Sequence, residues 1–433
     1  MILQAYLHGV HAGNFIQDAA GIFFEYADGY DVAIPVSISL PRFGMAGLGR
    51  RGRAQRRIVE NFLWGLLPDN PRRLEAIARD PNFGGPCSPN SVMQLIRKVG
   101  ADCAGALQIV APEDVDQIVR DGGADPLTEE QIAQNLTHVI TTGSVPGSGE
   151  HPGAFSLPGA QPKIALLNKD DRWFQPWGSV PSTHIFKPAA MNLEGLVENE
   201  HLCLETAAEM GLTTTCSKIA HFGEHVVIVV ERYDRVFDGD SVLRVHQEDM
   251  CQALGLHPGQ KYESDGGPGI AQIDSVLIGS RRAQDDRLAF MKAIIFNFLI
   301  EGTDAHAKNY SILHGERGFR LAPLYDIASF LPYHDGRNPR MPMRIADKRE
   351  YGDVALRHWR QLAKKVRMDE DRLVDALWEM AHQLPDAMAA VVRRCHLAGL
   401  KAPILDKVLD GVAARCADQL RLWKLDPVGQ NEP

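Results

Sequence analysis

The chain has 433 residues, of which 45% are hydrophobic, 23% charged and 7% aromatic, values that are ordinary for a globular protein. They exclude a chain that is disordered, collagen-like or coiled-coil throughout. The formal net charge of −9 provides no general attraction to nucleic acid or to an anionic membrane, although a local basic patch remains open.

The cysteines and the apolar runs indicate a cytoplasmic protein. None of the seven cysteines belongs to a C-x-x-C pair, so we expect reduced, mostly buried thiols rather than a zinc or redox centre. The first 13 residues lack the features of a signal peptide. The dense apolar run at 226–230 is far shorter than the ~20 residues that a membrane helix needs. We therefore expect no membrane partner.

In chain order, the first predicted element is a small antiparallel sheet within the first forty residues, where short apolar runs alternate with glycine and aspartate. A basic stretch from Arg50 to Arg57 then leads into a predicted helix over 58–67. A short strand is expected over 104–110. Residues 142–159 hold many glycines, prolines and serines, which is typical of a linker or mobile loop.

After this linker the sequence first alternates strand-like and helical segments and then becomes helical. The predicted strands are 164–167, 183–187 and 226–231, and the predicted helices are 196–210 and 290–300, with a helical period from Val354 onward. The sequence thus predicts an α+β fold whose C-terminal third is all helix. We expect three parts: an N-terminal subdomain over 1–141, a nucleotide-binding part over 142–235, and a mostly helical catalytic lobe over 236–433.

One segment carries a recognisable chemical pattern. Asp304 and Asn309 stand in a D-x-x-x-x-N spacing, and Asp326 follows after a predicted hairpin over 311–321. In kinase catalytic loops such an aspartate faces the acceptor hydroxyl and the asparagine holds Mg²⁺. Mg²⁺ prefers a few hard oxygen ligands together with substrate phosphates. Asn309 and Asp326 are therefore the predicted metal ligands.

Residues upstream of this pattern occur in the order found in kinases. Lys187 ends a predicted strand, as a phosphate-binding lysine does, and the helix that follows offers Glu198, Glu200 and Glu205 as alternative ion-pair partners. The run 231–234 stands where a hinge would contact adenine. This order favours a phosphoryl-transfer site over a chance pair of polar residues.

Three further segments remain ambiguous on residue chemistry alone. The loop 156–163 could cover nucleotide phosphates with its backbone, although it lacks the Walker A spacing. The polar loop 261–269 could belong to the site or could only connect elements. The Arg50–Arg57 cluster could contact DNA phosphates or an acidic partner, or could be a solvated helix face.

Taken together, these motifs resemble the HipA-type toxin kinases over essentially the whole chain. The segments that carry the resemblance are 39–41, 66–69, 156–163, 230–235, 247–252, 261–269, 302–309 and 324–327.

The resemblance implies a bilobal, protein-kinase-like fold and a serine/threonine kinase that uses ATP and Mg²⁺, with a small mixed N-terminal lobe and a mostly helical C-terminal lobe. The implied catalytic residues are Asp304, His306 and Lys308. Ser156 corresponds to the serine that these kinases autophosphorylate, which ejects the phosphate-binding loop and switches the enzyme off. The residues implied in nucleotide binding are Ser156, Leu157, Pro158, Gly159, Ala160, Gln161, Lys163, Lys187, Glu231, Tyr233, Asp234, Gln247, His306, Asn309 and Asp326.

The resemblance also implies partners. These are a HipB-like helix-turn-helix antitoxin, operator DNA bound mainly through the antitoxin complex, and an aminoacyl-tRNA synthetase substrate, above all glutamyl-tRNA synthetase. Phosphorylation of the synthetase would inhibit translation and promote persistence. Two alternatives remain open: a kinase for a small molecule, and a DNA corepressor with little kinase activity.

Overall fold

The computed structural model describes residues 1–30, 33–40, 49–80, 85–143, 155–189, 193–239, 241–334, 336 and 338–425. The chain divides into two compact units. Unit 1 consists of Met1–Pro188, Ala220–Gly259 and Ser311–Phe319, and unit 2 consists of Ala189–Ile219, Gln260–Tyr310 and Arg320–Pro433. The chain therefore passes from one unit to the other several times.

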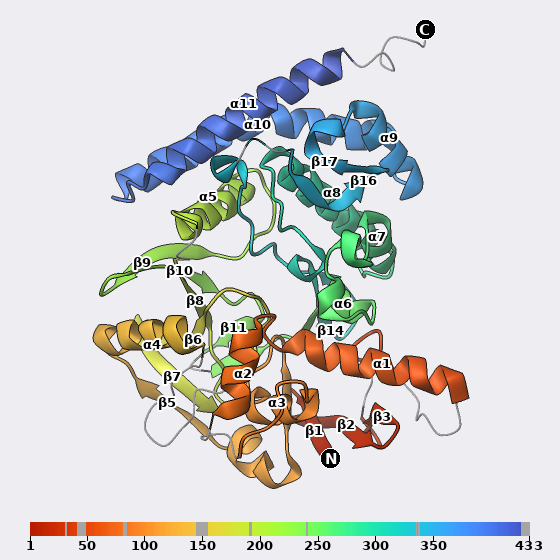
Figure 1. Ribbon diagram of the computed structural model, residues 1–433, viewed down its shortest axis with the longest axis vertical. Coiled ribbons are helices and arrows are strands. Elements are labelled where there is room, and N and C mark those ends of the chain that lie inside the picture. Colours follow the sequence, from red (N-terminus) through yellow and green to blue (C-terminus); the bar gives the residue numbers. More distant parts are fainter. Residues whose placement is uncertain are drawn as a thin grey trace. The chain divides into compact units, whose positions relative to one another are not determined.

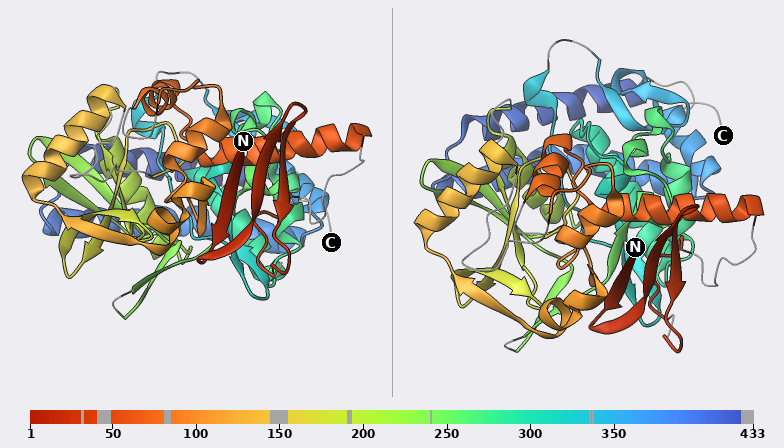
Figure 2. Two further views of the ribbon diagram at one scale, coloured as in Figure 1. Left: turned by 90° about the horizontal axis from the view of Figure 1, so that it is seen from below. Right: turned by 60° about the horizontal axis from the view of Figure 1, so that its bottom comes forward.

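Unit 1 begins with the antiparallel sheet that the sequence predicts. Its strands are β1 (Ile2–Leu7), β2 (Val10–Asp18), β3 (Gly21–Tyr26) and β4 (Leu107–Val110), in the order β3-β2-β1-β4. The helices α1 (Gly49–Leu66), α2 (Pro71–Arg79) and α3 (Val92–Val99) follow β3, and α1 runs beside β1–β3 (Figure 2). Phe15, Phe24 and Phe62 are fully buried between them, so the alternating apolar residues of the strands build this core.

Two predicted boundaries in this region were wrong. Helix α1 begins at Gly49, not at residue 58, so the basic stretch with its glycines is helical. The strand β4 begins only at Leu107, because residues 101–106 form a turn in which Gly105 has a φ of +81°.

A second sheet completes the main part of unit 1. Its strands are β5 (Gly122–Pro126), β6 (Ile164–Lys169), β7 (Arg172–Gly178), β8 (His184–Pro188), β9 (Ser217–Phe222) and β10 (His225–Glu231), in the order β5-β7-β6-β8-β10-β9. Helix α4 (Glu129–Thr142) lies on this sheet (Figure 1) and buries Ile132, Leu136 and Val139 against it. The predicted linker starts where α4 ends, and its residues 144–154 lie outside the described residues.

Short strands, one short helix and several turns connect these two sheets to the rest of the chain. They are β11 (Arg235–Asp238), β12 (Ser241–Arg244), β13 (Gln247–Asp249), α6 (Met250–Ala253), β14 (Ser311–Gly315) and β15 (Gly318–Leu321). Short turns of 3₁₀ or π helix occupy 112–114, 116–120, 258–260, 263–265, 307–309, 331–333 and 351–353. Strand β14 lies between β13 and β15, and the predicted hairpin over 311–321 is confirmed.

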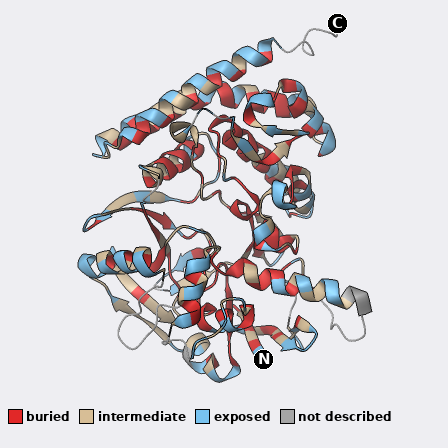
Figure 3. Ribbon diagram, in the orientation of Figure 1, coloured by how far each residue is buried: buried red, intermediate tan, exposed pale blue. Residues whose placement is uncertain are grey.

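Unit 2 is mostly helical. Its helices are α5 (Leu196–Glu209), α7 (Ile270–Leu277), α8 (Ala283–Leu299), α9 (Leu356–Lys365), α10 (Glu370–Leu397) and α11 (Pro403–Lys424). The predicted apolar stripe of α10, which includes Leu373, Leu377 and Leu384, is buried. Buried and exposed residues alternate along α10 and α11 (Figure 3), as expected for helices that pack on one face.

The C-terminal third is not all helix. Strands β16 (Arg340–Ile345) and β17 (Lys348–Glu350) form a hairpin that the sequence did not predict. Pro342 and the flanking arginines conceal the strand pattern, and the turn places Ala346 in the left-handed region, where alanine is rare. Among the described residues, no helix is long and apolar enough to cross a membrane.

Candidate active site

The segment after α8 forms a tight, backbone-fixed turn in unit 2. The amide of His306 donates to the carbonyl of Asp304 at 2.7 Å, and the amide of Asn309 donates to the carbonyl of His306 at 2.9 Å. A Cβ at Gly302 would lie 2.3 Å from Oδ1 of Asn297, so a larger residue there would displace the Asn297 side chain. The D-x-x-x-x-N spacing therefore places Asp304 and Asn309 at fixed positions on one short turn.

Asp304 is the accessible acid of this turn. Its side chain is 64% exposed, and Nε2 of His306 lies 3.6 Å from its Oδ1. The hydroxyl of Tyr262 donates a hydrogen bond to the same oxygen. An exposed carboxylate that already accepts a hydroxyl hydrogen bond has the position and chemistry to orient the hydroxyl of a substrate.

Tyr262 is a site residue that the sequence analysis did not single out. It belongs to the ambiguous loop 261–269, whose Lys261 carbonyl accepts a hydrogen bond from the amide of Ala307 at 3.1 Å. The loop therefore packs directly on the turn 302–309, called the catalytic turn below because it holds the predicted catalytic residues. Its position in the chain, 42 residues before Asp304, gave no local signal of this contact.

His306 lies behind Asp304 as an uncharged group. Burial lowers its pKa below the usual value, and the nearby Asp304 opposes this effect only in part. The edge of its ring meets the Tyr262 ring at a centroid distance of 4.9 Å, and its Nδ1 is buried without a hydrogen-bond partner. At neutral pH, His306 thus supports Asp304 and Tyr262 by packing and does not neutralise the carboxylate.

Asn309, one of the two predicted metal ligands, lies beside the backbone of the other, Asp326. Nδ2 of Asn309 donates to the Asp304 carbonyl at 2.7 Å and to the Asp326 carbonyl at 3.4 Å. Because the amide nitrogen makes both contacts, the side-chain oxygen is the atom left for a cation. Asp326 adopts a φ of +57°, a conformation that is uncommon for a residue other than glycine and that is held here by its surroundings. One amide oxygen and one carboxylate fit Mg²⁺, which completes its shell with phosphate oxygens and water.

Lys308 is also implied as catalytic and is almost fully buried. Its carbonyl accepts a hydrogen bond from the hydroxyl of Tyr325 at 2.6 Å, which ties the catalytic turn to the segment that carries Asp326. The described residues contain no cluster of three or more His, Cys, Asp or Glu that could hold a metal ion.

Ser156 is fully buried in unit 1. Its Oγ donates to the carbonyl of Leu66 at 2.7 Å, and its amide donates to the carbonyl of Asp102 at 3.0 Å. Leu157 packs beside it in a small apolar cluster with Phe155. A kinase therefore reaches this hydroxyl only after the segment leaves its site.

The rest of the loop 156–163 folds back on itself and on its neighbours. Nζ of Lys163 donates to the carbonyl of Pro158 at 2.6 Å, and a Cβ at Gly159 would lie 2.4 Å from that nitrogen. The carbonyl of Ala160 accepts from Nδ2 of Asn70, and Nε2 of Gln161 donates to the carbonyl of Pro188. These contacts define a compact loop that leads directly to β6.

The predicted nucleotide residues of β8 and β10 lie on paired strands. Lys187, nearly buried, is opposite Ile228, and the exposed Glu231 is opposite His184. The three candidate glutamates lie on α5, in unit 2. Which of them pairs with Lys187 stays a prediction.

The segment after β10 holds the predicted hinge. The hydroxyl of Tyr233 donates to Oε1 of Gln247, so two predicted nucleotide contacts lie side by side. Asp234, another predicted nucleotide contact, is buried. Its two carboxylate oxygens accept hydrogen bonds from Arg232 and from the amide of Gly105.

Comparisons with known proteins agree with the architecture of both units. Residues 3–110 match the HipA N-terminal domain, and residues 155–388 match the HipA-like C-terminal domain. The chain belongs to the HipA family. The α+β, HipA-like kinase fold that the sequence predicted is thereby confirmed.

Relatives in the HipA family align with nearly the full chain. A protein of Sinorhizobium fredii named as a candidate kinase, Y4mE, is 32% identical over 424 residues, which cover 96% of this chain and 97% of that protein. The serine/threonine-protein kinase toxin HipA of Shewanella oneidensis is 26% identical and covers 90% and 89%. The solved complex of Shewanella oneidensis HipA with HipB and operator DNA superposes with a TM-score of 0.82 at 24% identity, over all of both chains.

Proposed function

We propose that the chain is the toxin kinase of a toxin–antitoxin pair and transfers the γ-phosphate of ATP to a serine hydroxyl of a protein. The observation that carries this proposal is the catalytic turn, on which an exposed Asp304 is fixed beside Asn309 and Asp326. Membership of a kinase toxin family supports it.

In this mechanism, Asp304 orients the acceptor hydroxyl and accepts its proton late in the transfer. Lys187 contacts the phosphates of ATP, together with the loop 156–163, and Glu231, Tyr233, Asp234 and Gln247 bind the nucleoside. Asn309 and Asp326 would hold Mg²⁺, which supplies neutralisation of the developing phosphate charge. Because the transition state is loose, positioning and charge neutralisation account for most of the acceleration.

We also propose that Ser156 is the site of self-phosphorylation. The serine has no exposed surface, and its hydroxyl donates to Leu66. A phosphate there would lose that hydrogen bond and would have no room in the buried site, so a modified Ser156 could not return. The loop that contacts ATP would then stay displaced, which explains how modification inactivates the enzyme.

The proposed partners are a HipB-like antitoxin, operator DNA bound within that complex, and an aminoacyl-tRNA synthetase, with glutamyl-tRNA synthetase first. The solved Shewanella complex contains HipB and operator DNA. On α1, Arg53 and Arg57 are exposed, whereas Arg56 is paired with Asp18 at 2.8 Å and lies over the Phe23 ring. Among the arginines of this cluster whose side chains the structure describes, Arg53 and Arg57 are therefore the ones available for a phosphate or an acidic partner. We place these reactions in the cytoplasm.

The experiment is intact-mass spectrometry after incubation with Mg-ATP, alone and with a panel of synthetases. Asp304→Asn, which keeps the side-chain shape, is the matched control. One added phosphate on the wild-type chain and one on a synthetase, neither with the variant, would support both kinase chemistry and target class. Phosphate on small alcohols alone would favour the small-molecule kinase.

The corepressor alternative needs a separate measurement, because it involves no phosphate transfer. Operator binding with and without the antitoxin, measured over a range of salt concentrations, gives the number of DNA phosphates that this chain itself contacts. A folded chain that steepens the salt dependence but transfers no phosphate would be a corepressor.

A further inference from the structure

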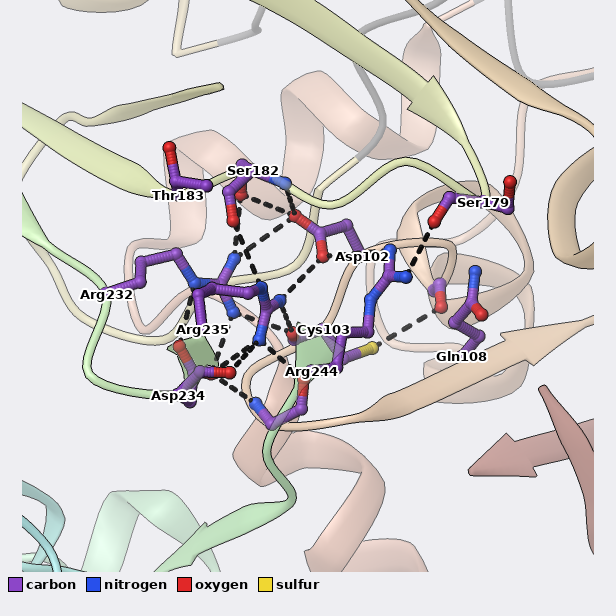
Figure 4. A network of polar contacts seen from close by, with 12 residues as sticks. Asp102, Cys103, Gln108, Ser179, Ser182, Thr183, Arg232, Asp234, Arg235 and Arg244 are labelled. Carbon is purple, nitrogen blue, oxygen red and sulfur yellow. Dashed lines mark hydrogen bonds and ion pairs between the residues drawn. The ribbon is translucent and has the colours of Figure 1, made fainter. Parts of the chain in front are cut away.

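A buried network of five charged residues lies in unit 1 (Figure 4), and only one of them, Asp234, belongs to the predicted nucleotide-binding residues. Its members are Asp102, Arg232, Asp234, Arg235 and Arg244, and no side chain among them is more than 10% exposed. Three arginines against two aspartates leave the network with one net positive charge. Buried charges are costly unless they are paired and hydrogen-bonded, so each contact in such a network constrains the backbone that carries it.

Asp102 is the centre of the network. Its Oδ2 accepts from Nη1 of Arg232 at 3.1 Å and from the hydroxyl of Ser182, and its Oδ1 accepts from Arg235 at 2.8 Å and from Arg244 at 3.4 Å. Burial by itself raises the pKa of this carboxyl, but the three arginines outweigh burial and hold the pKa far below its usual range. Asp102 is therefore charged and holds both hinge arginines.

The hinge segment is hydrogen-bonded to the turn that carries Asp102. Arg232 donates to the carbonyl of Cys103 at 2.9 Å, and Arg235 donates to the carbonyl of Gly105 at 2.9 Å. The amide of Gly105 donates in turn to Asp234 at 2.6 Å. The turn 102–105 is thus joined by hydrogen bonds in both directions to the predicted hinge 231–234 and to Arg235, the residue that follows it.

The same turn approaches the predicted nucleotide contact Gln247. A Cβ at Gly105 would lie 2.7 Å from the backbone nitrogen of Gln247, closer than side chains are found to approach. Any residue larger than glycine would push Gln247, and with it the hydroxyl of Tyr233 that donates to Gln247.

The backbone of this turn also holds the Ser156 segment. The carbonyl of Asp102 accepts from the amide of Ser156, and Cys103 forms an isolated parallel β-bridge with Ser156. Ala104 packs in the apolar cluster of Phe155 and Leu157. One residue, Asp102, therefore contacts the hinge through its side chain and Ser156 through its carbonyl.

We propose that Asp102 is a positioning residue that couples the nucleotide hinge to the burial of Ser156. Its role rests on the proposed kinase function, because the hinge matters only if a nucleotide binds there. A nucleotide that orders the hinge stabilises the turn 102–105 and, through it, the buried position of Ser156. By linkage, release of Ser156 weakens nucleotide binding by the same factor.

The test uses the full chain, without ATP and with Mg-ADP, in the variants Asp102→Asn and Asp234→Asn. Asparagine retains the shape of each side chain and removes the charge. Asp234 contacts the hinge arginines and Gly105 but makes no contact with Ser156. It is therefore the matched control.

Three quantities are measured. They are the rate of amide hydrogen exchange at 155–163, the Kd of Mg-ADP by calorimetry, and the KM for ATP and kcat, determined separately. For Asp102→Asn we expect faster exchange at Ser156 and a higher Kd, each by about tenfold, within the usual range of coupling between sites. KM should rise while kcat at saturating ATP stays within about twofold. For Asp234→Asn we expect the higher Kd with a smaller increase in exchange at Ser156 than in Asp102→Asn, because Asp234 reaches Ser156 only through Gly105 and the rest of the turn.

Other outcomes overturn the inference. A purely structural role of Asp102 would speed exchange throughout unit 1 and lower kcat through loss of folded enzyme, without the KM change. Wild-type exchange at Ser156 in Asp102→Asn would also overturn the coupling, whether or not the chain is a kinase.

Two arms of the design keep the outcomes separate. A folded wild-type chain that binds no ADP would refute the kinase proposal and the nucleotide half of the coupling together, whereas the exchange measurement would still test the link from Asp102 to Ser156. If Asp102→Asn does not fold, Ser182→Ala removes one hydrogen bond to the same carboxylate. It should shift exchange at Ser156 in the same direction by a smaller factor, and an unchanged rate would again count against the coupling.

Discussion

The catalytic turn of unit 2 and the Asp102 network of unit 1 differ in how far their carboxylates are exposed and in how many basic side chains contact them. Asp304 is 64% exposed and has one tyrosine hydroxyl and one neutral histidine beside it. Asp102 is only 8% exposed and contacts three arginines. A charge that must meet a substrate has to remain accessible, and it then contributes little to stability. A buried, paired charge fixes the backbone, and its loss is costly. Substitutions at Asp304 should therefore lower kcat without changing stability, whereas substitutions in the Asp102 network should change stability and nucleotide affinity more than kcat.

The largest expected effect is on catalysis. Asp304→Asn should lower kcat by a factor of about 10²–10⁴, the range for loss of a general base, and should leave the unfolding midpoint unchanged because the side chain is exposed. Asp285→Asn is the matched control, since that aspartate is 68% exposed on α8 and pairs only with Arg282. An active Asp304→Asn enzyme would remove Asp304 from the mechanism.

The next effect is on stability. Arg232→Met should lower the free energy of unfolding by about 3–5 kcal/mol, because it leaves Asp102 and Asp234 buried with fewer partners. Urea denaturation followed by circular dichroism measures the change. Arg244→Met should cost less, since Arg244 contacts the network only through Asp102 at 3.4 Å. Equal losses from both substitutions would contradict the central place of Arg232.

A smaller effect concerns pH. Burial lowers the pKa of His246 to about 3, and the neighbouring His314 adds to this effect. Smaller contributions come from His8, which also lowers the pKa, and from Asp234 and the hydrogen bond to the Val36 carbonyl, which raise it. Above pH ~6.5 the histidine is neutral in both the folded and the unfolded chain. Below that pH only the unfolded chain takes up the proton, so the free energy of unfolding should fall by about 1.4 kcal/mol per pH unit.

Denaturant unfolding at pH 7 and pH 5 tests this expectation. The wild type should lose about 2 kcal/mol more than His246→Gln over this interval. Glu248, which accepts from His314 at 2.8 Å, is present in both proteins and cancels in the comparison. An identical pH dependence in the two proteins would show that His246 is not the group that titrates.

The smallest effect should come from Tyr262→Phe, which removes one hydroxyl and keeps the ring that packs on His306. A single hydrogen bond is worth about 0.5–1.5 kcal/mol, so kcat should change about 2–10-fold. Steady-state kinetics with saturating ATP measures it. A loss as large as that of Asp304→Asn would make Tyr262 a catalytic residue rather than a support.

The sequence could indicate candidate site residues where the signal is local. Asp304, Asn309 and Asp326 could be proposed because their spacing along the chain is itself the signal, and the structure shows that Asn309 contacts the backbone of the other two. The apolar stripe of α10 was predictable for the same reason, because its period repeats along one helix.

The sequence could not predict contacts that the fold alone creates. Asp102 and Arg232 are 130 residues apart, and nothing near either residue distinguishes this pairing from any other aspartate–arginine pair. Tyr262 and Asp304 present the same difficulty. The strands β16 and β17 were missed because Pro342 and the arginines conceal the alternation that marks a strand.

The repeated passage of the chain between the units has a consequence for any attempt to divide the gene. Strand β10 of unit 1 pairs with β8, and β13 pairs with β14, although residues of unit 2 intervene along the chain in both cases. A protein truncated after Pro188 would lack β10, β13 and β14, and the complementary fragment would carry those strands without β8. A cut placed anywhere in the gene before residue 311 thus separates pieces of the same unit, so neither unit can be produced from one uninterrupted segment of the chain.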